Sequence, residues 1–183
     1  EEDFSATQQV TVTPAAVPAD ESGQTVTYSL SPTTVDFAAV TIDSSTGQVS
    51  ISAVSHGNGS QLFTITANDQ QAANNTATQT FTLTVNAVND APVASDQALS
   101  TGEEKSLAIT LTASDVEGSE LTYTVVDQPS KGTVSGTFPS LTYTPNVDYS
   151  GSDSFTFKAN DGSVDSNTAT VTITVSAVND VPV

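Results

Sequence analysis

Cysteine is absent from the 183 residues of this chain, so disulfide bonds contribute nothing to its stability. Small secreted domains without disulfides often rely on a bound metal ion instead. Zinc is a poor candidate, because the chain has no cysteine and a single histidine, His56. If a metal ion stabilises the fold, it should therefore be one that binds oxygen ligands.

Basic residues are scarce as well. The chain has 21 acidic residues and only three basic ones, Lys105, Lys131 and Lys158, which gives a formal net charge of -18. Phosphate binding requires clustered lysine and arginine, so nucleic acid is excluded as a partner, and an anionic membrane surface would repel the chain. Such an excess of one charge destabilises a compact fold unless cations offset it.

Long apolar runs are also missing. No segment approaches the length of a membrane span and no signal peptide is visible, so we expect no membrane insertion. We expect any targeting or anchoring parts to lie elsewhere in a longer parent protein.

The chain does contain an internal repeat. The phrase Val-Asn-Asp-x-Pro-Val ends at Val93 and again at Val183, and Phe63–Asp69 matches Phe155–Asp161. The copies lie roughly 90 residues apart, which suits two small domains that each bury a modest core. The sequence therefore predicts two modules, residues 1–90 and residues 91–183.

Alternating apolar and polar residues, rich in β-branched side chains, mark short strands separated by turn residues. The segment Ser44–Gly47 is typical of a hairpin turn in which glycine supplies a positive φ. No stretch has sustained helical periodicity, so the pattern predicts an all-β chain of antiparallel sandwiches. The expected strands are Gln9–Thr13, Gln24–Leu30, Val40–Ile42, Gln48–Ser52, Leu62–Ala67 and Thr78–Asn86 in module one, and Ser106–Ala113, Glu120–Val126, Thr133–Ser135, Ser140–Thr144, Ser154–Ala159 and Ala169–Ser176 in module two.

Acidic residues fall at the ends of these strands. If successive strands run up and down a sandwich, alternate loops gather at opposite poles of each module. The joint between the modules then collects the acidic residues Glu1, Glu2, Asp3, Asp90, Asp115, Glu117 and Asp161. The outer pole of module one holds Asp20 and Asp69, and the far pole of module two holds Glu103, Glu104, Asp148, Asp153, Asn179 and Asp180.

Carboxylates brought together in this way repel one another by roughly 1 kcal/mol per pair in water, and by more where water is excluded. A calcium ion would remove that repulsion, because it accepts about 6–8 oxygen ligands from carboxylates, amides and backbone carbonyls. The sequence therefore predicts calcium at the joint. The alternative is that each of these acids is an ordinary solvated loop residue.

Several motifs of module two resemble those of bacterial cadherin-like tandem repeats, which occur in large secreted adhesins and exoproteins. They are Tyr149–Phe155, Ala159–Gly162, the strand Thr168–Val175 and the closing phrase Val178–Val183. The resemblance covers nearly the whole chain. It implies two tandem cadherin/immunoglobulin-like Greek-key β-sandwiches joined end to end, calcium between consecutive modules, and a mechanical or adhesive role.

The resemblance also implies ligand positions. Module one departs from the pattern, since Ser22 and Gln61 stand where acidic residues are expected and the first strand is expected to be missing or to come from the parent protein. The implied ligands are Glu1, Glu2, Asn89, Asp90, Asp115, Glu117 and Asp161 at the joint, Asp20, Asn68 and Asp69 in an outer half-site, and Glu103, Glu104, Asp153, Asn179 and Asp180 in a terminal half-site.

These expectations describe a calcium-stiffened spacer of a bacterial adhesin or cell-surface protein, located outside the cell, whose partners are neighbouring repeat modules. An enzyme is not expected, because His56 lies alone in a turn with no counterpart in module two. Self-association through exposed strand edges is a further alternative, although the net charge opposes it.

Carbohydrate binding is the main rival function, as in modules that accompany polysaccharide-degrading domains. The absence of tryptophan argues against it. Most of the Tyr and Phe residues alternate with polar residues along strands and are expected in the core. Of those near loops, Phe138 and Tyr149 are the candidates for contact with sugar, and the alternative is that each folds over the edge of the core.

Overall fold

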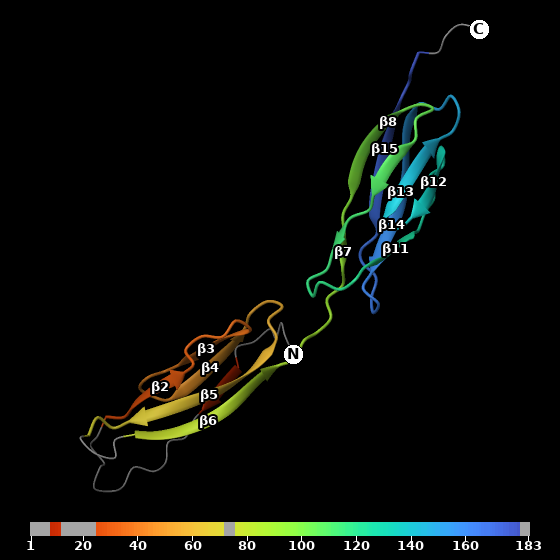
Figure 1. Cartoon of the computed structure of the whole chain (residues 1–183). Helices are drawn as coiled ribbons and strands as arrows, with labels where there is room; N and C mark the ends of the chain where they lie inside the picture. Colours follow the sequence, from red (N-terminus) through yellow and green to blue (C-terminus); the bar gives the residue numbers. More distant parts are fainter. Residues whose placement is uncertain (1–7, 12–24, 72–75, 180–183) are drawn as a thin grey trace. The chain divides into compact units, whose positions relative to one another are not determined.

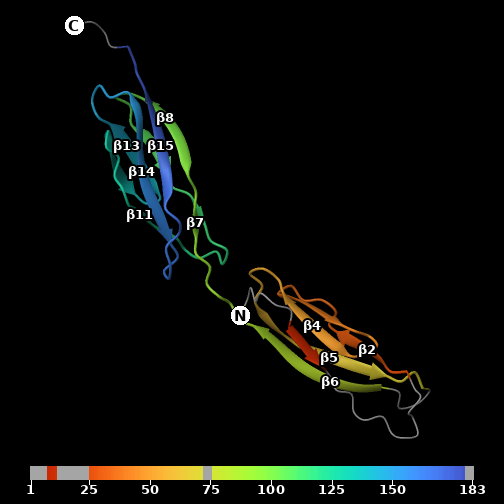
Figure 2. The same cartoon turned by 180° about the vertical axis from the view of Figure 1, so that it is seen from behind.

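The computed structural model describes residues 8–11, 25–71 and 76–179, and the chain divides into two compact units, Glu1–Val88 and Asn89–Val183 (Figures 1 and 2). The predicted boundary between residues 90 and 91 lies slightly further along the chain. Both units are built of β-strands. No helix among the described residues has the length and apolar character needed to cross a membrane.

Unit one is a sandwich of two antiparallel sheets. One sheet has the order β1 (Gln8–Thr11), β4 (Gln48–Ala53), β3 (Ala38–Ile42), and the other has the order β2 (Thr27–Ser31), β5 (Gly59–Asn68), β6 (Thr76–Val85). Alternate residues of β2, β3, β4, β5 and the end of β6 point inward, as the period of a β-strand requires. They form a core that includes Tyr28, Leu30, Val49, Ile51, Phe63 and Ile65.

Unit two repeats this design with additional strands. One sheet has the order β11 (Thr122–Val125), β14 (Gly151–Asn160), β15 (Ala169–Ser176), β8 (Gln97–Gly102), and the facing sheet has the order β12 (Gly132–Thr137), β13 (Ser140–Pro145), β9 (Leu107–Thr110). A short pair joins β7 (Val93–Ala94) to β10 (Ala113–Ser114). Strands that neighbour one another in a sheet are mostly not consecutive in sequence, as in a Greek key.

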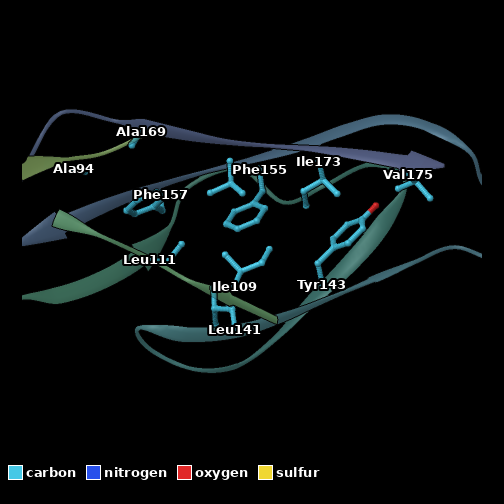
Figure 3. Close-up of a cluster of buried hydrophobic side chains, with 11 residues drawn as sticks. Ala94, Ile109, Leu111, Leu141, Tyr143, Phe155, Phe157, Ala169, Ile173 and Val175 are labelled. Carbon is cyan, nitrogen blue, oxygen red and sulfur yellow. The ribbon is translucent and has the colours of Figure 1, made fainter. Parts of the chain in front are cut away.

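The core of unit two lies between its two sheets (Figure 3). Phe155 and Phe157 of β14 point toward Ile109, Leu141 and Tyr143 of the facing sheet, and all of these side chains are buried. The sequence predicts core positions for these aromatic residues from their alternation with polar residues, and the structure confirms them. Burying such side chains contributes about 1.5–3 kcal/mol each relative to exposure, which makes this core the main source of stability.

The predicted strands are present in the described residues, with boundaries that differ by a few residues, but the sequence does not predict β7 and β8, and the predicted strand Ser106–Ala113 joins β9 to the start of β10. Strand β8 matters most, because it pairs in parallel with β15 along Val171–Ser176. It has one large apolar side chain, Leu99, that packs against the core. A single apolar residue in a short segment gives too weak an alternation for a strand to be recognised.

The strand pairing defines two poles of unit two. The register pairs Thr122, the first residue of β11, with Asn160, the last residue of β14. The loops 115–121 and 161–168 therefore meet at one end of the unit, which we call the entry pole because Asn89 also contacts it. The opposite end, the exit pole, holds Glu103, whose backbone amide donates to Ser176 O at 2.9 Å. This grouping of loops is the one that the up-and-down arrangement of strands predicts.

Candidate functional site

The loop after β14 places Asp161 at the entry pole. Asp161 Oδ1 accepts hydrogen bonds from the backbone amides of Ser163, at 2.6 Å, and Val164, at 2.7 Å. The side chain of Asn160 accepts from the amide of Gly162 at 2.8 Å, and Gly162 has a φ of 97° that favours glycine. Asparagine and aspartate commonly close turns in this way, so the Asn-Asp pair shapes the loop in which it lies.

The second oxygen of Asp161 reaches the segment that leads into unit two. Asn89 Nδ2 donates to Asp161 Oδ2 at 2.7 Å across 72 positions of sequence, and it also donates to the carbonyl oxygen of Asp90 at 3.2 Å. The hydrogen bond from Asn89, together with those from the amides of Val164 and Ser163, lowers the pKa of Asp161. Two of the predicted joint residues are thus brought into direct contact, and the carboxylate stays charged at neutral pH.

Asp115 lies on the neighbouring loop of the same pole. Its Oδ1 accepts from the amide of Ser119 at 2.9 Å, and its carbonyl oxygen accepts from the amide of Gly118 at 3.3 Å. Its Oδ2 is enclosed, yet no donor among the described residues reaches it. Burying a carboxylate oxygen costs free energy unless a hydrogen-bond donor or a cation lies beside it. Oδ2 of Asp115 is therefore a candidate ligand atom for a cation.

The described residues do not by themselves complete a metal site. Within those ranges, no group of three or more His, Cys, Asp and Glu side chains lies close enough together to hold a metal ion. Calcium also accepts amide and carbonyl oxygens and water, which suits Asn89 and the loop backbone. Glu117 is exposed and Asp90 is partly exposed at the surface of unit two, and the predicted ligands Glu1 and Glu2 lie outside the described residues.

The predicted outer half-site of unit one repeats the turn around Asp161. Asn68 Oδ1 accepts from the amide of Gln70 at 2.7 Å, and Asp69 Oδ1 accepts from the amide of Gln71 at 3.0 Å. The repeated Ala-Asn-Asp phrase therefore has a conformational role in both units, besides any role in binding. Asp20, the other acidic residue predicted here, lies outside the described residues.

The predicted terminal half-site falls at the exit pole. Glu103 Oε1 accepts from the backbone amide of Val178 at 2.6 Å, which ties the turn after β8 to the chain beyond β15. Glu104 and Asn179 are exposed, and Asp180 lies outside the described residues. The role of these residues as calcium ligands stays a prediction.

Asp153 differs from the other members of that predicted group, because its side chain points into the sandwich. It is only 5% exposed. Its oxygens accept from Tyr143 Oη at 2.8 Å and from the backbone amides of Ser130 and Lys131, each at 3.0 Å, and of Ser154 at 2.9 Å. The structure thus gives Asp153 an internal hydrogen-bonding role, whereas the resemblance implies a calcium ligand of the terminal half-site at this position.

The electrostatics of Asp153 follow from this setting. Burial acts to raise its pKa, but the hydrogen bonds from Tyr143 and the three amides together hold the pKa of Asp153 below its usual value. Burial and the same hydrogen bond raise the pKa of Tyr143. A sequence signal for this role exists, since Asp153 precedes Phe155 and Phe157 at the period of two that places side chains on the buried face.

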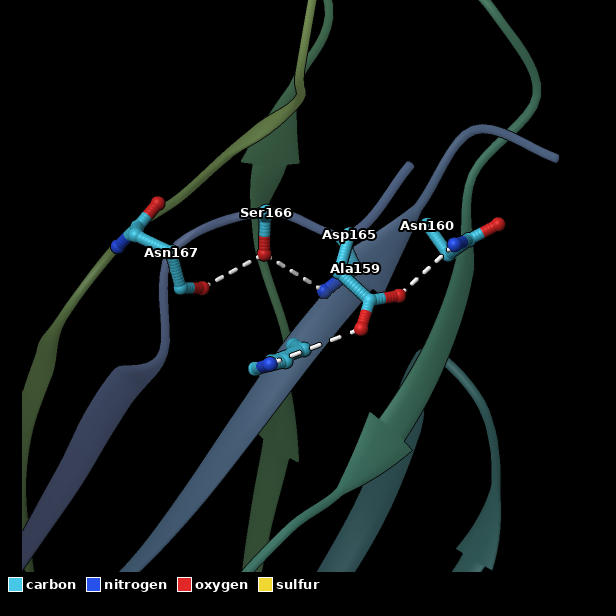
Figure 4. A network of polar contacts seen from close by, with 6 residues as sticks. Ala159, Asn160, Asp165, Ser166 and Asn167 are labelled. Atoms are coloured by element: carbon cyan, nitrogen blue, oxygen red, sulfur yellow. Dashed lines mark hydrogen bonds and ion pairs between the residues drawn. The ribbon is translucent and has the colours of Figure 1, made fainter. Parts of the chain in front are cut away.

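A polar network that the sequence does not predict lies beside the entry pole, and Figure 4 shows the hydrogen bonds that join Ala159, Ser166 and Asn167 in it. The side chain of Asn167 bonds both backbone groups of Ala94, accepting from its amide at 2.9 Å and donating to its carbonyl oxygen at 3.0 Å. Ser166 is buried and joins this network, accepting from the amide of Ala159 at 2.9 Å. The amide side chain thus acts as a second partner of β7, besides β10, and anchors this strand beside the entry pole. No repeat or acidic motif marks these residues.

The two aromatic candidates for sugar contact, Tyr149 and Phe138, differ in their exposure to solvent. Tyr149 is partly buried against the core, and its hydroxyl donates to Ser152 O at 2.6 Å, so it folds over the edge of the sandwich. Phe138 is 43% exposed at the hairpin between β12 and β13. A single exposed ring offers little of the aromatic platform that sugar binding requires.

Comparisons with known proteins show which folds this chain resembles. The family model described as bacterial Ig domain matches residues 89–174. Among solved structures, the chain is similar to protocadherin gamma B2 extracellular cadherin domains 1–5, with 15% identity, a TM-score of 0.54, and coverage of 98% of this chain and 41% of that one. It is also similar to mouse cadherin-23 EC22-24, with 24% identity, a TM-score of 0.52, and coverage of 84% and 53%.

A third similar structure is an endo-fucoidan hydrolase from glycoside hydrolase family 107, at 23% identity and a TM-score of 0.39, with coverage of 86% of this chain and 24% of that one. No curated protein matches the chain. The chain spans less than two thirds of each of these solved chains. The family match and the cadherin folds confirm the likeness to bacterial cadherin-like repeats that the sequence predicts, and show that the units are cadherin-like and immunoglobulin-like sandwiches.

Proposed function

We propose that this chain is a calcium-stiffened spacer segment of an extracellular bacterial protein. The observation that carries the proposal is the enclosed Oδ2 of Asp115, which no donor of the described residues reaches at the pole where Asn89 and Asp161 meet. A carboxylate oxygen in this position is most easily satisfied by a cation. The bacterial Ig domain match and the cadherin folds agree with this function.

The residues at the entry pole offer the oxygen ligands that a calcium ion would take. Asn89 donates through Nδ2, so its Oδ1 is the atom that a cation would take. Asp115, Glu117 and Asp161 would supply carboxylate oxygens, and the backbone of the loops would supply carbonyl oxygens. Asp90, Glu1 and Glu2 are the further ligands that the resemblance implies.

Calcium bound there would act by linkage, since an ion that binds the ordered pole stabilises it by RT ln(1 + [Ca²⁺]/Kd). The ion would also offset part of the net charge of -18. Extracellular modules bind calcium with a Kd of about 0.1–1 mM, which suits an environment outside the cell. The partners of such a spacer would be the neighbouring repeat modules of its parent protein.

The test is thermal unfolding of the full chain in calcium and in EDTA, for the wild type, Asp115→Asn and Glu120→Gln. For a Kd of about 1 mM, 10 mM calcium should stabilise the wild type by about 1.4 kcal/mol. That corresponds to a rise in Tm of about 5 °C or more for a domain of this size. Asp115→Asn should lose most of the rise.

Glu120→Gln is the matched control, because Glu120 is an exposed acid just before β11, at the same pole, and is not a predicted ligand. It removes the same charge and should keep the calcium response. An equal loss in both variants would show unspecific charge screening and would contradict a site at Asp115. A wild-type Tm that calcium leaves unchanged would overturn the proposed function and would make sugar binding at Phe138 the next hypothesis to test.

A further inference from the structure

The two units close one loop in the same way, but with a different residue at one position. In unit two the phrase Ala-Asn-Asp at the end of β14 is followed by Gly162, whose amide donates to Asn160 Oδ1 at 2.8 Å. In unit one the same phrase at the end of β5 is followed by Gln70, whose amide donates to Asn68 Oδ1 at 2.7 Å. Both residues have a positive φ, 97° at Gly162 and 65° at Gln70. The turn itself therefore does not require glycine.

Packing does not require glycine at this position either. Gly162 is exposed, and a Cβ on it would have no atom within 4 Å apart from its chain neighbours. The absence of a Cβ has a chemical consequence instead, because nothing shields the backbone nitrogen of Gly162 from the carboxyl group of Asp161.

An aspartate that precedes glycine can form a cyclic imide. The backbone nitrogen of Gly162 forms a bond to Cγ of Asp161, a C–O bond of the carboxyl group breaks, and the amide proton leaves with that oxygen as water. A second water molecule then opens the ring. Its attack on Cγ restores aspartate, whereas its attack on the backbone carbonyl carbon gives isoaspartate, in which the main chain runs through Cγ. The overall reaction consumes no other reagent and leaves the mass unchanged.

The folded loop engages both reacting groups in other contacts. The amide of Gly162 donates to Asn160 Oδ1, while Asp161 Oδ1 accepts from the amides of Ser163 and Val164 at 2.6 and 2.7 Å. The nitrogen of Gly162 can reach Cγ of Asp161 only when these hydrogen bonds break. Exposed loops open locally at a small cost in free energy, so the reaction has a route in the folded protein.

We propose that Asp161 is a site of isoaspartate formation in this protein, and that Asn160 slows the reaction by binding the amide of Gly162. Isomerisation adds one carbon to the main chain of the loop and shortens the side chain that bears the carboxylate. The hydrogen bond from Asn89 Nδ2 to Asp161 Oδ2 is then lost. The modified protein therefore loses this link between the entry segment and the entry pole. The reaction does not depend on calcium.

The test incubates the full chain at neutral pH in EDTA and measures isoaspartate at residues 161 and 69. Chromatography with electron-transfer fragmentation detects it, since the mass does not change. A synthetic peptide of residues 159–167 gives the rate without the folded loop and should isomerise fastest. Asn160→Ala should isomerise about three to ten times faster than the wild type, as the loss of one hydrogen bond implies. Asp69 should stay unmodified, because Gln70 carries a Cβ.

The matched control is Asp165→Asn. Asp165 Oδ1 accepts from Asn160 Nδ2 at 2.8 Å (Figure 4), so this variant alters the surroundings of Asn160 but leaves its Oδ1 bound to the amide of Gly162. It should isomerise at the rate of the wild type. Gly162→Gln, which copies unit one, should stop the reaction.

Equal rates in the wild type and Asn160→Ala would overturn the role of Asn160, as would a wild type that isomerises as fast as the peptide. Isoaspartate at Asp69 in the same amount as at Asp161 would overturn the role of Gly162. Its absence at residue 161 from both the wild type and Asn160→Ala would overturn the site.

Discussion

The side chains of Asp153 and Asp161 show how the surroundings of a residue decide its role. Both carboxylates accept several hydrogen bonds, and the pKa of each is lowered. Asp161 holds an exposed loop and reaches Asn89, whereas Asp153 is 5% exposed and joins Tyr143 to the backbone at Ser130 and Lys131. Asp161 can therefore still bind a cation, whereas the hydrogen-bonding capacity of Asp153 is already filled by the protein.

Replacing Asp153 should therefore affect stability rather than calcium binding. We expect Asp153→Asn to lower the free energy of unfolding by about 2–3 kcal/mol, because one amide oxygen cannot accept all the bonds that the two carboxylate oxygens accept. The measurement is denaturant unfolding in calcium and in EDTA. The loss should be equal in both, and Tyr143→Phe should show a smaller loss of the same kind.

Glu104→Gln is the control, since Glu104 belongs to the same predicted half-site but is exposed. It should leave the stability in EDTA unchanged. If Asp153→Asn instead abolished a calcium response that the wild type shows, Asp153 would be the ligand that the sequence predicts.

At the scale of an element, the hairpin between β3 and β4 is built from its own five residues. Asp43 Oδ1 accepts from Ser45 Oγ at 2.6 Å and from the amides of Ser45 and Thr46, each at 2.8 Å. Gly47 has the positive φ, of 73°, that the sequence predicts for this turn. A Cβ at this position would lie 3.1 Å from the ring of Tyr28, so glycine also lets the turn pack closely on the core.

The hairpin should make the stability of unit one depend on pH in the acidic range. The hydrogen bonds from Ser45 and Thr46 lower the pKa of Asp43 to about 2. A lowered pKa means that the stabilisation is complete above the ordinary value of about 3.9 and is lost as the pH falls through the folded value. The difference in Tm between the wild type and Asp43→Asn should therefore be constant above pH ~4 and shrink toward pH ~2.

Asp36→Asn serves as the control, because Asp36 is an exposed acid of the same unit outside the hairpin. The change of charge is the same in both variants, so the dependence on pH that Asp43→Asn shows beyond Asp36→Asn belongs to the hairpin. A difference for Asp43→Asn that stayed constant down to pH ~2 would contradict the role of the ionised carboxylate.

At the scale of the whole molecule, the described residues form two hydrophobic cores, one in each compact unit. Phe63 and Phe155 are equivalent in the repeat, and they are 0% and 1% exposed. Each unit thus buries its own apolar side chains, which is what independent folding requires. The family match also falls within one unit, at residues 89–174.

The two units should unfold as separate transitions. We expect Phe63→Ala and Phe155→Ala each to destabilise one unit by about 3–5 kcal/mol, because each removes a fully buried ring. Calorimetry of the full chain should show one transition move in each variant while the other stays. A single transition that moves in both variants would mean that the units fold as one cooperative body.

The sequence by itself determines the class of this protein and most of its strands. Alternation at a period of two marks a buried face locally, and Gly47 and the Asn-Asp phrases mark turns, so these features need no distant contact to be recognised. The repeat then predicts two similar sandwiches. The up-and-down arrangement of strands also predicts correctly which loops of unit two share a pole.

Only the tertiary structure decides which atoms meet. Asn89 reaches Asp161 across 72 positions, and Asn167 reaches Ala94 across 73. Strand β8 is recognisable only beside β15, because its own pattern has a single large apolar residue. Asp153 lies in phase with Phe155, yet its partners come from other loops. Such contacts depend on how distant strands pack, and local periodicity does not encode them.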